Sequence, residues 1–191
     1  MDSVQANAVT AMNKSPSVEF RKLRVLVYDK NNKRAGSVRK VLDNLGIGET
    51  FDTSAVIPAL ECIRIFQLSM MLVDLEDKDE PSNSVALMEA LRDPERSPAP
   101  GLPVLGVMKN VTRENLIAAI HVGSDFVIQR PFSGRILANR IIAMLLAPAP
   151  QFVSSNYTGP DRRRMPDNLY DGDLRRGNDS QTAKPLALHS I

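Results

Sequence analysis

Two apolar stretches, residues 24–31 (RVLVYDKN) and residues 71–77 (MLVDLED), indicate the fold most directly. Each consists of a short β-branched run that leads straight into an aspartate, Asp29 in the first and Asp74 in the second. Continuous apolar runs of this length, without polar alternation, are typical of strands that are buried on both faces. The two stretches therefore predict central strands of a parallel sheet, each with a carboxylate at its carboxyl end.

The rest of the middle region repeats the same pattern of a strand followed by a helix. Three further strands are predicted at 50–53, 103–107 and 126–129, beside those at 23–28 and 70–73. Amphipathic segments at helical spacing separate them, within 38–45, 55–66, 84–91, 116–120 and 136–146. Five such units predict an α/β domain, a doubly wound five-stranded parallel sheet with helices on both faces.

The composition divides the chain into three parts. Residues 1–19 lack hydrophobic periodicity and are expected to be a flexible leader, and residues 20–147 to be the folded domain. Residues 148–191 are rich in proline and show no strand or helix pattern, so we expect a flexible tail. A net charge of +2, the single Cys62 and the lack of an apolar span favour a cytoplasmic protein that binds neither nucleic acid nor membrane.

Charged residues follow the predicted strands where the strands end. Asp29 and Lys30 follow the first strand, Asp74 and Glu76 the third, and Arg130 the fifth. In a doubly wound sheet the carboxyl ends of neighbouring strands meet at one crevice, which is where sites form. We expect these side chains to converge there.

Four segments in this order, RVLVYDKN, MLVDLED, PVLGV and GSDFVIQRPFS, resemble the receiver domain of bacterial two-component response regulators, from about residue 23 to residue 146. The resemblance implies a flavodoxin-like sheet. It also implies that Asp74 is at the phospho-acceptor position and that Asp29 is the first acid of a magnesium site. In that family a second acid, a strand-four hydroxyl and a strand-five lysine complete the pocket.

The chain departs from the family pattern at four pocket positions. Lys30 replaces the second acid, Met108 the hydroxyl residue and Arg130 the lysine, while Glu76 lies where a methionine or proline is usual. A lysine at a magnesium-ligand position opposes binding of the ion, because two unit charges about 4 Å apart repel by about 4 kcal/mol at an effective dielectric near 20. We therefore expect an internal ion-pair network with Lys30 as the resident cation and no bound cofactor. A phosphorylation-competent Asp74 that uses magnesium is the alternative, and unrelated surface charges are a third interpretation.

One segment of the tail is distinctive. Tyr157 is followed by a turn and by Arg162, Arg163 and Arg164, and the segment is similar to Gly-Pro-Asp-Arg-Arg segments that follow degenerate receiver domains in some bacterial proteins. An aromatic ring with three arginines is suited to docking on an acidic or phosphorylated partner. A charged linker without a partner is the alternative.

These features predict an atypical single-domain response regulator of the pseudo-receiver type that is not an enzyme. It would act by protein contact on a bacterial signalling protein, such as a histidine kinase or a regulatory target, and could form a homodimer. A conventional phospho-acceptor of a phosphorelay is the alternative. A nucleotide-binding α/β enzyme is disfavoured because no G-x-G-x-x-G follows the first strand.

Overall fold

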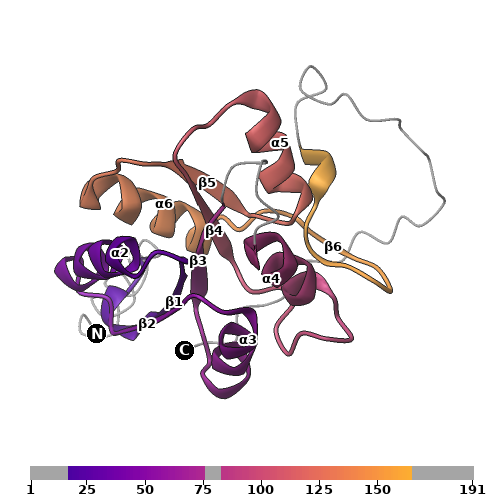
Figure 1. Cartoon of the computed structure of the whole chain (residues 1–191), viewed down its shortest axis with the longest axis horizontal. Coiled ribbons are helices and arrows are strands. Elements are labelled where there is room, and N and C mark those ends of the chain that lie inside the picture. Colours follow the sequence, from indigo (N-terminus) through magenta and orange to yellow (C-terminus); the bar gives the residue numbers. More distant parts are fainter. Residues whose placement is uncertain (1–16, 76–82, 165–191) are drawn as a thin grey trace, which may run out of the picture.

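The computed structural model describes residues 17–75 and 83–164, whose centre is a five-stranded parallel sheet (Figure 1). Its spatial order is β2-β1-β3-β4-β5, and every neighbouring pair is parallel. The strands are β1 (Arg24–Tyr28), β2 (Glu49–Thr53), β3 (Met70–Asp74), β4 (Val104–Met108) and β5 (Phe126–Gln129). The predicted doubly wound α/β sheet is confirmed.

Five helices cover the two faces of this sheet. They are α2 (Asn32–Asn44), α3 (Val56–Ile65), α4 (Asn83–Arg92), α5 (Arg113–His121) and α6 (Gly134–Leu146). One core lies under α2 and α6 and the other under α3, α4 and α5 (Figure 1). Strand β1 serves both cores because successive side chains point to opposite faces: Val25 and Val27 enter the first, and Leu26 and Tyr28 the second. This is why the strand shows no polar alternation.

The strand order places the site. The chain leaves β1 towards β2 on one side and returns to β3 on the other, so the direction of winding reverses between β1 and β3. The carboxyl ends of β1 and β3 are therefore at the topological switch point, where ligands bind in open α/β sheets.

The folded part of the chain extends beyond both of the expected boundaries, residues 20 and 147. The short helix η1 (Phe20–Lys22) precedes β1, and Val18, expected to belong to the leader, packs partly against the first core. Residues 1–16 and 165–191 lie outside the described residues. No helix in the described ranges is long and apolar enough to cross a membrane.

The expectation that residues after 147 form no regular structure is wrong for 151–164. Strands β6 (Gln151–Val153) and β7 (Thr158–Pro160) form an antiparallel hairpin, and the 3-10 helix η2 (Arg162–Arg164) follows (Figure 1). Strands of three residues are too short to show a periodic pattern, and the hairpin is held by contacts with the body that sequence periodicity does not reveal. That residues 20–147 fold without the hairpin stays a prediction.

Candidate functional site

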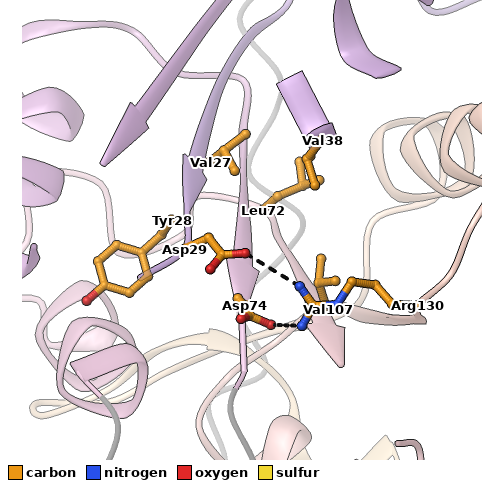
Figure 2. Close-up of a pocket in the computed structure, with 8 residues that line it drawn as sticks. All are labelled: Val27, Tyr28, Asp29, Val38, Leu72, Asp74, Val107 and Arg130. Carbon is orange, nitrogen blue, oxygen red and sulfur yellow. Dashed lines mark hydrogen bonds and ion pairs between the residues drawn. The ribbon is translucent and has the colours of Figure 1, made fainter. Parts of the chain in front are cut away.

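Two buried aspartates form the centre of the site. Asp29 directly follows β1 and Asp74 ends β3, and the two residues are 3% and 4% exposed. They line a pocket together with Arg130 and with Val27, Tyr28, Val38, Leu72 and Val107 (Figure 2). The expected convergence of Asp29, Asp74 and Arg130 is therefore observed.

Arg34, in the first turn of α2, bridges both carboxylates. Its Nη2 donates to Asp29 Oδ1 at 2.8 Å and to Asp74 Oδ2 at 2.5 Å, and its Nε lies 3.1 Å from Asp29 Oδ2. Its side chain is 42% exposed, so the guanidinium covers the two acids from the solvent side.

Arg130, the residue directly after β5, bridges the same two carboxylates. Its Nη2 donates to Asp74 Oδ1, and its Nη1 lies 3.5 Å from Asp29 Oδ2 (Figure 2). Each aspartate therefore faces two guanidinium groups and each arginine faces two carboxylates. The formal charge of these four side chains is −2 + 2 = 0.

The position of Arg34 follows from how α2 begins. Asn31 caps the helix, because its side chain accepts hydrogen bonds from the backbone N–H groups of Lys33 and Arg34. Asp29 Oδ1 in turn accepts the backbone N–H of Asn31 at 2.7 Å. These hydrogen bonds to the side chains of Asp29 and Asn31 fold the chain so that the first turn of α2 lies over Asp29. The pattern Asp-x-Asn-x-x-Arg was the available signal for Arg34, and sequence reasoning missed it.

The expectation that Lys30 is the resident cation is corrected. The structure places Arg34 and Arg130 on the two carboxylates, while Lys30 is exposed. Asp29 points inward, and Lys30 follows it just before the chain turns into α2. Met108 ends β4 and is buried in the second core, as its apolar side chain favours, and Glu76 lies outside the described residues.

A magnesium ion does not fit this arrangement of charges. Magnesium takes near-octahedral oxygen ligation at about 2.0–2.1 Å, usually with one or two carboxylates. Here the inward oxygens of both carboxylates accept hydrogen bonds from arginines, and a divalent ion between them would meet two positive charges. Within 17–75 and 83–164, no group of three or more acidic, histidine or cysteine side chains could hold a metal.

The pKa of the Asp74 carboxyl is raised above its ordinary value. Burial is the largest cause and the nearby Asp29 charge adds to it, and together they outweigh Arg130 and Arg34, which lower the pKa. An acid whose pKa is raised by folding binds its proton more tightly in the folded state than in the unfolded chain. Its contribution to stability is complete below the ordinary pKa and is lost as the pH rises through the folded pKa.

A comparison of the wild type with Asp74→Asn tests the direction of this pH dependence of stability. The variant keeps the shape of the side chain but does not titrate, so the difference between the two proteins isolates Asp74. We expect the wild type to gain stability relative to Asp74→Asn when the pH is lowered from neutral to about the ordinary pKa of aspartate. Urea unfolding at a series of pH values measures it. A relative loss of wild-type stability towards acid would mean that the arginines dominate the titration.

The tail residues expected to dock a partner lie in and beside the hairpin. Tyr157 is buried, and its hydroxyl donates to the Pro160 carbonyl at 3.0 Å, so its side chain packs within the hairpin. That Tyr157 takes part in docking a partner stays a prediction. Burial raises the pKa of this hydroxyl, which favours the protonated donor. Arg162 and Arg163 are exposed, and the side chain of Arg164 lies outside the described part.

The strand order, the two helical layers and the pair of aspartates after β1 and β3 define a protein with the receiver fold, the flavodoxin-like fold of CheY. No family model and no curated protein matches the chain.

Solved structures of receiver domains are similar in fold. The chemotaxis response regulator CheY4 of Vibrio cholerae is 16% identical, with a TM-score of 0.52 over 63% of this chain and 98% of its own. The receiver domain of a Francisella response regulator is 24% identical, with a TM-score of 0.52 over 63% of this chain and 93% of its own. A Burkholderia pseudomallei protein described as related to pilus assembly is 18% identical, with a TM-score of 0.55 over 66% of this chain and 92% of its own. At these identities the likeness establishes the fold.

Proposed function

We propose that this chain is an atypical response regulator that acts in bacterial signal transduction by protein contact, without magnesium and without phosphorylation. The observation that carries the proposal is the pair of arginines on the pocket acids. Arg34 and Arg130 each contact both Asp29 and Asp74, which fills the cation position of the pocket with the protein's own side chains. Such a pocket is held in one state.

The altered end of β4 supports the same proposal. Met108 occupies the position at which the resemblance to receiver domains implies a hydroxyl, and a thioether cannot donate a hydrogen bond to a phosphoryl oxygen. One group that would stabilise charge on a transferred phosphoryl group is therefore replaced by a core side chain. The domain would serve as a binding module and not as an enzyme.

A conventional phospho-acceptor is the second candidate, and one observation favours it. Asp74 occupies the acceptor position at the carboxyl end of β3, and Asp29 lies in the same pocket. Arg34 is 42% exposed, and its movement towards solvent would uncover both acids. The partner in this case would be a histidine kinase. In the leading proposal, the partner is a kinase or a regulatory target.

Incubation with acetyl phosphate and magnesium separates the two candidates. We expect the intact wild-type chain to gain no phosphoryl mass on Asp74 and to show no saturable heat in a magnesium titration. The physical reason is that Arg34 and Arg130 cancel the negative charge that would attract the ion. A conventional receiver domain treated in parallel shows that the reagents work. Phosphate on Asp74, located by mass spectrometry of peptides, would establish the phosphorelay candidate instead.

A further inference from the structure

The β6–β7 hairpin is closed by bonds from its own turn and ends. Ser154 N–H donates to the Tyr157 carbonyl at 2.8 Å, and Asp161 N–H donates to the Pro150 carbonyl at 2.7 Å. The Tyr157 hydroxyl also donates to the Pro160 carbonyl, and the β6–β7 ladder joins the two strands. Hydrogen bonds therefore close segment 150–161 at its turn, along its strands and where its two ends meet. The hairpin is a defined element and not an extended linker.

A buried arginine lies where this hairpin packs on the body. Arg92 ends α4, is 1% exposed, and donates to the backbone carbonyls of Gly123, Pro100 and Leu102 and to the Asp125 carboxylate. The other Asp125 oxygen lies 3.4 Å from Gln151 Nε2 of β6.

Glycine at position 159 allows the hairpin to approach this arginine closely. A Cβ at Gly159 would lie 2.7 Å from Arg92 Cδ and 2.8 Å from the Tyr157 hydroxyl oxygen. Contacts this close leave no room for a side chain. The hairpin therefore packs at the amino ends of β4 and β5, whereas the pocket lies at the carboxyl ends of the strands.

Two exposed arginines rest on the aromatic rings of the hairpin. The guanidinium carbon of Arg162 lies 3.8 Å from the centre of the Tyr157 ring, and that of Arg163 lies 5.2 Å from the centre of the Phe152 ring. A guanidinium on a ring face keeps N–H edges for other acceptors and loses less side-chain freedom on binding. The side chain of Arg163 is 58% exposed. The hairpin therefore holds two cations in a fixed arrangement on the surface.

We propose that Arg162 and Arg163 on η2, beside the β6–β7 hairpin, form a docking surface for an acidic segment of a partner protein. Each guanidinium can bind a carboxylate through two parallel N–H groups. Asp161, whose carboxylate accepts the Nε–H of Arg163 at 3.2 Å, orients this arginine and adds one negative charge beside the surface. This inference rests on the proposed function as a protein-binding module and names the chemistry of its partner.

The surface fits an acidic peptide better than a nucleic acid. Among the side chains that the structure describes, Arg162, Arg163 and Asp161 give it a formal charge of +2 − 1 = +1, whereas a protein that makes about six to ten phosphate contacts on DNA needs several more cations. The Tyr157 ring is buried under Arg162, and the Phe152 ring faces Arg163, so both rings already have cations as partners and are poorly placed for stacking with bases.

Binding of a fluorescein-labelled hexaglutamate peptide to the intact chain tests this proposal. We expect saturable binding that weakens at least tenfold in Arg162→Ala/Arg163→Ala and less than threefold in Arg64→Ala/Arg135→Ala, measured by fluorescence anisotropy. The control pair removes the same two charges from exposed positions on α3 and α6. Equal weakening by the two double variants, no saturable binding, or tighter binding of an oligothymidylate of equal charge would overturn the proposal.

Two further variants test the fixed arrangement itself. Arg162→Lys/Arg163→Lys keeps the charge but lacks the planar fork, so we expect at least threefold weaker binding. Gly159→Ala forces the hairpin away from Arg92 and should weaken peptide binding while the circular dichroism of the body is retained. If the lysine variant bound the peptide as tightly as the wild type, positive charge alone would account for binding. That result would contradict the proposal. Loss of peptide binding leaves the magnesium and phosphorylation results unaffected, so the docking surface and the proposed pocket function can fail separately.

Discussion

Replacement of Arg92 with methionine is expected to lower the free energy of unfolding by about 3–5 kcal/mol. Arg92 makes five hydrogen bonds in the described part of the chain, one of them to the Asp125 carboxylate, and both side chains are nearly inaccessible to solvent. Methionine fills a similar length but leaves a buried carboxylate and three carbonyls without these donors. Since whole domains are stable by about 5–15 kcal/mol, this single change removes a large share. Urea unfolding followed by circular dichroism measures it.

Controls for this prediction lie close by in the sequence. Arg96→Met changes an exposed arginine four residues later and should cost less than about 0.5 kcal/mol. Asp125→Asn combined with Arg92→Met should cost less than the sum of the two single changes, because the double variant buries no uncompensated charge. A cost below about 1 kcal/mol for Arg92→Met would show that water or rearranged carbonyls replace the guanidinium.

Replacement of Arg34 with glutamate is expected to turn the neutral pocket into a magnesium site. The formal charge of the pocket changes from 0 to −2, as Asp29, Asp74 and residue 34 then contribute three carboxylates against Arg130. That count equals the one usual for a pocket of three carboxylates and one lysine. We expect saturable magnesium binding in the millimolar range for this variant and none for the wild type, measured by isothermal titration calorimetry.

Lys30→Glu is the matched control for Arg34→Glu. It makes the same change of charge next to Asp29 but at an exposed position, and it leaves both guanidinium bridges in place. We expect magnesium to bind at least tenfold more tightly to Arg34→Glu than to Lys30→Glu. Similar affinities would identify overall charge, and not the arginine bridge, as the reason why the pocket disfavours the ion. Met108 remains in both variants, so neither is expected to become an efficient phosphoryl acceptor.

The comparison of Lys30 with Arg34 shows how far sequence reasoning reaches at a site. That a cation neutralises the acids was predictable from the departures at the ends of β1 and β5. Which cation does so depends on how the chain turns after Asp29, and the Asn31 cap brings residue 34, and not residue 30, over the carboxylates. The partner docking expected for the tail stays a proposal. In the structure, the Tyr157 ring packs against the Arg162 guanidinium.

The sequence by itself determined the five strands, the helices between them and the positions of Asp29, Asp74 and Arg130. These features depend on local runs of apolar residues and on the rule that parallel strands end at one edge. The tertiary structure alone decided that Arg34 joins Asp74 across 40 residues, that Arg92 is buried against Asp125 across 33, and that the hairpin packs beside Arg92 and Asp125. A charged side chain gives no periodic signal, because its environment is set by distant segments that supply its acceptors. An arginine in a core and an arginine on a surface therefore look alike until the chain is folded.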